Sequence, residues 1–219
     1  MDNLGIYVLL SLELLTAILA AFYYNKHKTN SAKWLFIVFL YTAVNEIAMS
    51  LLKEVDLFVN NNLYYNIYDV FIFTALPFVF RAHIKSQKSR VLVKVFVVLF
   101  LISVFINSFF ESFTNSKLNV AFSLGGVLLI ITIVCYFIDL LSNSNLELLS
   151  KKLLVYIGAG YLIFQVCFIP LDLVRFLMSN GLGDFYNAIY NFRVFIIVLT
   201  YLIFSIGYIT CYKNNSIKV

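Results

Sequence analysis

Charged side chains interrupt four of the long apolar stretches in this sequence, and they have the clearest potential for chemistry. They are Glu46, Asp69, Asp172 and Arg193. A charge at the centre of a membrane costs about 2.5–3.5 kcal/mol on insertion scales, so each of them needs a partner or a function. A guanidinium can hold an anionic group, and carboxylates can hold a cationic or hydroxyl group. The set therefore predicts a site for a small polar or zwitterionic ligand.

Each of these charges belongs to a row of polar residues at the spacing of one helix face. Glu46 lies between Thr42 and Ser50, and Asp172 precedes Arg175 by three residues, so that those two could pair. Four such rows at one depth, roughly 10 Å below the outer membrane surface, predict a shared polar cavity. The candidate ligand-binding residues are Glu46, Asn66, Asp69, Gln165, Asp172, Arg175, Tyr190 and Arg193.

The same charges permit a second interpretation, a buried ion network that only fixes how the helices pack. Such networks often add little net stability, and here three carboxylates face one or two guanidinium groups. Glu13 stands apart, near the middle of the first apolar stretch. It is either a protonated carboxyl hydrogen-bonded to a neighbouring helix or one step of a proton path. Asp139, near the end of the fifth stretch, is interpreted as an interfacial charge.

Motifs for catalysis and for cofactors are not found in these stretches. Both histidines, His27 and His83, lie outside the predicted apolar cores, and no Ser, Thr or Cys has a neighbouring base that would activate it. The seventh stretch has no internal lysine to which retinal could attach. We therefore expect no catalytic residue, no metal centre and no cofactor. An aspartate-dependent intramembrane lipid hydrolase using Asp69 and Asp172 stays open as an alternative.

Seven apolar segments must position these residues. The 219-residue chain is 62% hydrophobic and 12% charged with a mean hydropathy of +0.92, whereas soluble domains are about a quarter charged. A membrane-spanning helix needs about 20 mostly apolar residues. The sequence thus predicts an all-α polytopic membrane protein whose seven-helix bundle forms a single domain over 1–219. The expected spans are 4–24, 34–52, 62–81, 91–110, 119–142, 153–178 and 187–211.

Basic residues predict how the bundle is oriented. Of the 16 Lys and Arg residues, 12 follow or flank the first, third, fifth and seventh segments. Because cytoplasmic loops carry an excess of Lys and Arg, we expect the N-terminus outside the cell and the C-terminus in the cytoplasm. The membrane is expected to be the plasma membrane, which in a bacterium is the inner membrane. The charges are spread over several connections rather than over one face, so no nucleic-acid partner is expected.

A possible internal repeat and two resemblances to known families add to this interpretation. Tyr65–Ile72 reads YNIYDVFI and Tyr186–Ile197 reads YNAIYNFRVFII, which suggests a three-plus-one-plus-three repeat. In length and topology the chain resembles the SWEET and PQ-loop transporters, although it lacks their Pro-Gln pair. Its Phe-, Ile-, Tyr- and Asn-rich texture, together with the Tyr/Asn start of the third segment, resembles short uncharacterised seven-helix proteins of Bacteroidetes, some of them encoded near sensor kinases. That likeness implies a sensory context and transfers no site residues.

The leading hypothesis is a receptor-like protein in the lipid bilayer. It would bind its ligand in the outer half of the bundle and signal through 153–178 and 187–211 to a cytoplasmic or membrane partner. The alternative is a small-solute transporter that uses the same cavity, with a carboxylate as the site of proton coupling. Gly125, Gly126, Gly158 and Gly160 are expected to be close-packing positions rather than ligand loops.

Overall fold

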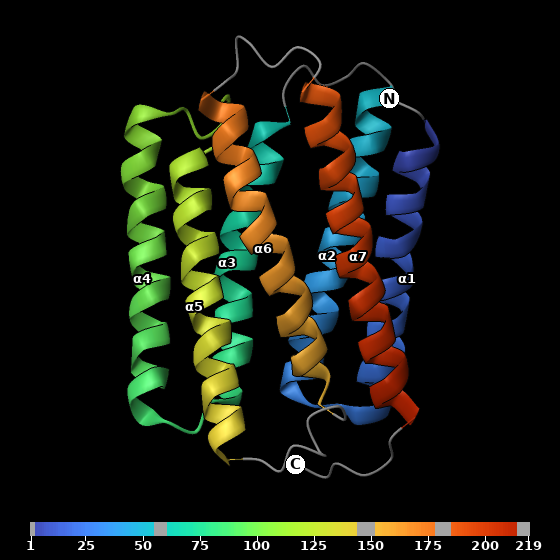
Figure 1. Cartoon of the computed structure of the whole chain (residues 1–219), viewed down its shortest axis with the longest axis vertical. Helices are drawn as coiled ribbons and strands as arrows, with labels where there is room; N and C mark the ends of the chain where they lie inside the picture. The colour runs from blue at the N-terminus through green and yellow to red at the C-terminus, as the bar shows by residue number, and fades with distance from the viewer. Residues whose placement is uncertain (1–2, 55–60, 144–151, 178–184, 214–219) are drawn as a thin grey trace.

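The computed structural model describes residues 3–54, 61–143, 152–177 and 185–213, and it confirms an all-α chain. Seven helices are present in these ranges, each long and apolar enough to cross a membrane. They run roughly side by side (Figure 1). The helices are α1 Asn3–His27, α2 Asn30–Glu54, α3 Asn62–His83, α4 Gln87–Phe110, α5 Asn119–Asn143, α6 Leu153–Leu177 and α7 Phe185–Lys213.

Local capping explains why two helices begin four residues before the apolar stretches that predicted them. The Thr29 hydroxyl accepts a hydrogen bond from the Ala32 amide at 3.2 Å at the start of α2, and the Ser86 hydroxyl accepts one from the Ser89 amide at 3.5 Å at the start of α4. These caps satisfy amides that a helix start leaves unpaired, so polar first turns can join the helix. Lys28 ends α1 because it adopts a left-handed φ of 48°.

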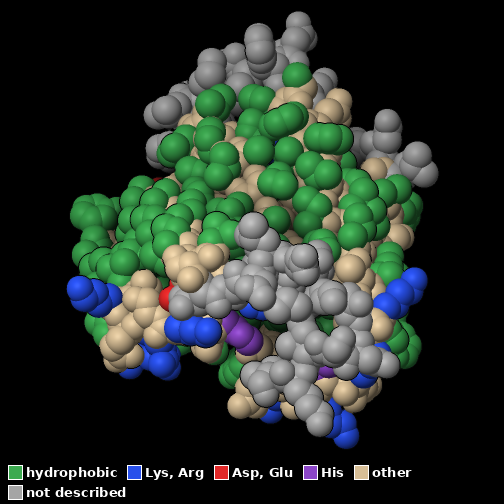
Figure 2. Space-filling view, turned by 60° about the horizontal axis from the view of Figure 1, so that its bottom comes forward, with side chains coloured by type: hydrophobic (Ala, Val, Ile, Leu, Met, Phe, Trp, Pro, Cys, Tyr) green, Lys and Arg blue, Asp and Glu red, His purple; other side chains and the backbone are tan. Residues whose placement is uncertain are grey.

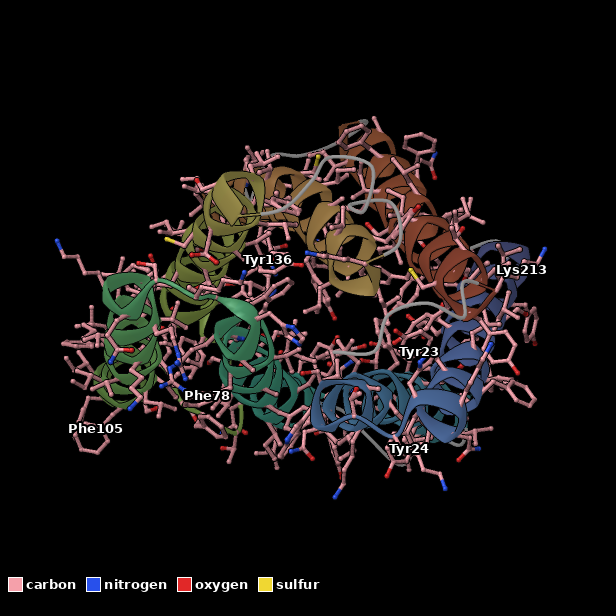
Figure 3. All side chains as sticks on the ribbon, turned by 90° about the horizontal axis from the view of Figure 1, so that it is seen from below. Tyr23, Tyr24, Phe78, Phe105, Tyr136 and Lys213 are labelled. Carbon is pink, nitrogen blue, oxygen red and sulfur yellow. The ribbon has the colours of Figure 1, made fainter. Side chains whose placement is uncertain are left out.

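Six helices form a closed ring, and α4 lies outside it. Around the ring the neighbours are α1, α2, α3, α5, α6 and α7, with α7 returning to α1, while α4 packs on the outer side of α3 and α5. Figure 3 shows this arrangement along the ring axis. The outer surface of α4 is correspondingly apolar, with Phe109 73% and Phe110 84% exposed. This helix connects the two halves of the ring and is displaced from its interior.

The ring consists of two three-helix halves, α1–α3 and α5–α7. α3 and α7 are separated by two helices in either direction around the ring, so the two segments with similar Tyr/Asn sequences take equivalent places. This order is compatible with a parallel repeat in which α4 is the connector. Between the halves, aromatic rings fill the interior, with Phe39 and Phe204 packed edge to face at a centroid distance of 5.1 Å.

Glycines let the helices of the second half approach closely. A methyl group added to Gly160 would overlap the Phe204 ring, and one added to Gly207 would overlap the Tyr156 Cβ. A methyl group on Gly158 would lie 3.1 Å from Ile133, and one on Gly125 would lie 2.7 Å from Phe73. The expectation that these glycines serve close packing is confirmed. Both α6–α7 contacts depend on the absence of a side chain.

Basic side chains gather at the end of the bundle where α1, α3, α5 and α7 finish. Figure 2 shows Lys and Arg side chains around the rim of this face. We call this end the basic end, and we call the opposite end, where α1 begins, the cavity end. Burial, followed by the charge of Lys85, lowers the pKa of Lys152. The described basic residues of the basic end are Lys26, Lys28, Lys33, Arg81, Lys85, Lys88, Arg90, Lys94, Lys152 and Lys213.

Asp139 fixes a turn at the basic end rather than acting only as an interfacial charge. It is 8% exposed, and its two carboxylate oxygens accept hydrogen bonds from the amides of Lys85 at 2.8 Å and Ser86 at 2.9 Å. These amides belong to the connection between α3 and α4. Asp139 therefore ties α5 to the turn that carries the chain out to α4.

We expect Asp139→Ala to lower the free energy of unfolding by about 2 kcal/mol, because two partly buried hydrogen bonds to a charged acceptor are lost. Asp139→Asn retains one acceptor oxygen, and its loss should be smaller. Chemical unfolding in mixed detergent micelles measures both values. Wild-type stability in the alanine variant would show that these hydrogen bonds contribute nothing to the folded state.

Candidate functional site

A cavity of about 540 Å³ occupies the ring interior toward the cavity end. Its lining comes from α1, α2, α3, α5, α6 and α7 and from the α4–α5 connection. None of the α4 residues, all of which the structure describes, lines it. The position of α4 outside the ring explains this. The charged lining residues are Glu13, Glu46, Asp69, Lys117 and Arg193.

Three carboxyl groups line the cavity, one from each helix of the first half. Glu46 and Asp69 are there as the polar rows predicted, and Glu13 lies with them rather than apart. The Tyr65 hydroxyl approaches Glu46 Oε2 at 3.5 Å. Glu13 is 8% exposed, and its Oε2 atom has no hydrogen-bond partner among the described residues. This acidic wall is Glu13, Glu46 and Asp69.

Two basic side chains also line the cavity and share one carboxylate. Lys117 Nζ lies 2.5 Å from Asp172 Oδ2, and Arg193 Nη1 lies 3.0 Å from Asp172 Oδ1. The Arg193 contact is an ion pair without the alignment of a hydrogen bond, since Oδ1 makes none. Asp172 itself is 4% exposed and lies behind the two cations. We call Lys117, Asp172 and Arg193 the charge triad.

Aromatic rings support the two cations of the triad. Lys117 Nζ lies 4.0 Å from the centre of the Phe122 ring, and the Arg193 guanidinium lies 4.8 Å from the centre of the Phe168 ring. A cation over a ring face is attracted by the negative face of the ring. These contacts hold both positive groups at the cavity surface while Asp172 restrains them from behind.

Lys117 is the residue that sequence reasoning missed, because a lysine in a polar connection normally points into water. The loop is held by Asn66, which donates to the Phe113 and Ser116 carbonyls at 2.8 Å each and accepts from the Leu118 amide at 3.1 Å. Asn66 was predicted to bind ligand, but it is not among the residues that line the cavity. Its side chain positions the segment that carries Lys117.

No protein-family model, curated protein or solved structure matches this chain. The site must therefore be interpreted from its own residues.

The remaining predicted residues divide into three groups. Gln165 is 2% exposed and lines the cavity, where its Oε1 has no partner among the described residues. Tyr190 is half-buried and is not a lining residue. The side chain of Arg175 lies outside the described residues, so its predicted pairing with Asp172 stays a prediction. Asp172 pairs with Lys117 from the α4–α5 connection and with Arg193 from α7.

The site contains more acid than base. Glu13, Glu46, Asp69 and Asp172 provide four carboxyl groups, and Lys117 and Arg193 provide two cations, which leaves two carboxyl groups in excess. Unpaired charges are costly in a buried site, so the acidic wall must hold protons or a cationic group. Three buried acceptors without partners among the described residues also face this space, namely Glu13 Oε2, Gln165 Oε1 and Thr200 Oγ1.

Proposed function

We propose that this chain is a receptor-like protein of the plasma membrane that binds a small zwitterionic ligand in the cavity. The observation that carries the proposal is that charges of both signs line one cavity, with the carboxyl groups of Glu13, Glu46 and Asp69 and the cations of Lys117 and Arg193. A ligand amine would neutralise the excess carboxyl groups. A ligand carboxylate would meet the two cations, which Asp172 holds in place.

The volume and lining support a small molecule rather than a peptide or a lipid chain. Small-molecule pockets are typically about 300–1,000 Å³, combining apolar walls with a few placed polar groups. Here Phe164, Phe168 and Phe204 supply apolar surface beside the charged groups. A lipid hydrolase using Asp69 and Asp172 gains little support, because each oxygen of Asp172 lies in an ion pair.

The proposed orientation places the cavity end outside and the basic end in the cytoplasm. The Lys and Arg residues at the basic end support this direction. α6 and α7 pack on each other along the ring, and α7 carries Arg193 at one end and Lys213 at the other. A ligand that moves Arg193 would shift α7, and a cytoplasmic or membrane partner would detect the change at the basic end.

A matched set of probes tests this proposal. Purified protein in detergent is heated with 6-aminohexanoate, with 4-aminobutanoate, with hexylamine and with hexanoate. We expect a zwitterion to raise the melting temperature at concentrations where the amine and the carboxylate alone do not, since only the zwitterion pairs with both kinds of charge. Equal responses to all four probes, or none, would favour the interpretation of the charges as a packing network.

The transporter alternative uses the same cavity, and flux distinguishes it. Proteoliposomes that accumulate the stabilising probe would support a transporter. Saturable binding without accumulation would support a receptor.

A further inference from the structure

A second polar feature continues from the cavity toward the basic end, between α1 and α7. On α1 it contains Glu13, Thr16, Tyr23 and His27, and on α7 it contains Tyr201, Ser205 and Tyr208. The two helices are neighbours in the ring and run in the same direction. The spacing of three, four or seven residues places each set on one helix face. We call these seven residues the α1–α7 seam.

The upper part of the seam begins in the cavity. Glu13 and Tyr201 both line it, and Glu13 lies within electrostatic reach of Tyr201. One turn below, the Thr16 and Ser205 hydroxyls lie 3.2 Å apart, within hydrogen-bond distance. Thr16 is 0% and Ser205 is 5% exposed. A buried pair of hydroxyl groups therefore lies between the helices about one turn from the cavity lining.

The lower part of the seam reaches the basic end through aromatic side chains. The Tyr23 and Tyr208 rings lie 5.7 Å apart, and the Tyr23 and His27 rings lie 4.3 Å apart. Figure 3 places Tyr23 on the inner side of α1 and Tyr24 on its outer side. Because helical side chains lean toward the N-terminus of their helix, Tyr208 on α7 leans toward Ser205 and the cavity.

Several seam atoms are buried without a hydrogen-bond partner among the described residues. They are Glu13 Oε2, the Tyr208 hydroxyl and His27 Nε2. Tyr208 is only 1% exposed. Buried polar atoms without partners cost about 1–3 kcal/mol each, so a purely structural seam would be expected to replace them with apolar groups. Their position along one line from cavity to basic end points to a role in transfer.

Aromatic rings and small side chains pack closely along the walls of the seam. Phe39 packs against Tyr208 at 5.8 Å and against Phe204 at 5.1 Å, and Ala20 is buried between the Thr16 and Tyr23 levels. The Thr16–Ser205 contact leaves no room for a hydrated ion. A hydroxyl group can accept one proton on its oxygen while it releases another. A proton can therefore be relayed along the seam while the oxygen atoms stay in place.

We propose that the α1–α7 seam carries protons between the cavity and the basic end. Water would bridge the seam atoms that make no hydrogen bond to one another. Each transfer breaks one O–H or N–H bond and forms another, and every hydroxyl again holds one proton when the transfer is complete. The net change is one proton added at Glu13 and one released at His27, or the reverse under an opposite gradient. This proposal does not rest on ligand binding, because the seam connects two surfaces whether or not the cavity is filled.

Other titratable groups face the seam from the elements packed against it. Glu46 on α2 lies near Glu13, and Tyr161 on α6 lies near Tyr208. At the basic end, Lys26 donates to the Tyr212 carbonyl and lies over the Tyr212 ring. The full set beyond the seam itself is Glu46, Tyr68, Tyr161, Lys26, Cys211 and Tyr212.

Proton flux in proteoliposomes tests the proposal. A potassium diffusion potential, negative inside, is imposed with valinomycin at equal pH on both sides, and an enclosed pH-sensitive dye records acidification. The external buffer contains choline instead of sodium and no ligand. We expect wild-type protein to acidify the lumen faster than protein-free liposomes do, and Thr16→Val and Tyr208→Phe to slow this rate about tenfold.

Matched variants in α5 separate transfer from packing. Thr132 is also 0% exposed, and its hydroxyl donates to the carbonyl four residues earlier at 2.8 Å, as that of Thr16 does. Tyr136 is 3% exposed and packs among aromatic rings, as Tyr208 does. Thr132→Val and Tyr136→Phe are therefore expected to retain the wild-type rate. A wild-type rate equal to that of empty liposomes, or equal losses in the seam and α5 variants, would overturn the proposal.

Discussion

Asp172→Ala is expected to lower the free energy of unfolding by about 3–5 kcal/mol, because it leaves two partly buried cations without their shared carboxylate. Lys117 and Arg193 side chains are each only 20% exposed, and both lie within 3.0 Å of an Asp172 oxygen. The effect is large because the repulsion between the two cations is then uncompensated as well. Chemical unfolding in mixed micelles, followed by tryptophan and tyrosine fluorescence, measures it.

A combined variant distinguishes an orphaned charge from a simple loss of packing. Asp172→Leu together with Lys117→Met and Arg193→Met removes the whole triad at similar volume. Because a buried ion network adds little net stability over apolar replacements, this variant should regain most of what Asp172→Ala loses. If the combined variant is as unstable as Asp172→Ala, the shape of Asp172 rather than its charge would account for the effect.

The second large effect concerns ligand selectivity, and it rests on the proposed function. With the zwitterionic probe that stabilises the wild type, Arg193→Gln and Glu46→Gln are each expected to weaken affinity by about 30-fold or more, because each leaves one charged end of the probe without its partner. The two variants should differ in which probes they still distinguish. Arg193→Gln should no longer distinguish the zwitterion from hexylamine, and Glu46→Gln should no longer distinguish it from hexanoate.

Isothermal calorimetry on detergent-solubilised protein gives these affinities. Glu111→Gln is the matched control, since Glu111 lies at the cavity end but is not a lining residue. Its affinity for the probe should equal that of the wild type. Equal losses for all three variants, or no change in preference for either end of the probe, would contradict a charge-separated binding site.

Much of the architecture follows from local properties of the chain. Long apolar stretches predict helices because the backbone must satisfy its own hydrogen bonds in lipid, and the helices lie within four residues of the predicted spans. The polar rows on α2, α3, α6 and α7 correctly indicated that Glu46, Asp69, Gln165 and Arg193 meet around one space. Each row is a property of one helix face and can be read without a structure.

Helical spacing does not predict where the side chains of the connections between helices lie. Lys117 enters the site only because Asn66 holds its loop over the ring, and a hydrogen bond between a helix and a distant loop leaves no periodic signal. Asn66 shares the polar row of Asp69, so its assignment to the ligand was reasonable from spacing alone. Helical spacing shows which side a residue is on, but not whether the ligand or a loop takes its hydrogen bonds.

By itself the sequence determined the seven apolar helices, the polar face of each and the concentration of positive charge at one end. Tertiary structure alone decided that α4 leaves the ring, that Glu13 joins Glu46 and Asp69, and that Asp172 pairs with Lys117 and Arg193. The physical reason is one of range. Hydropathy and helical period depend on neighbours a few residues apart, whereas the order and rotation of helices depend on packing between residues far apart in the chain.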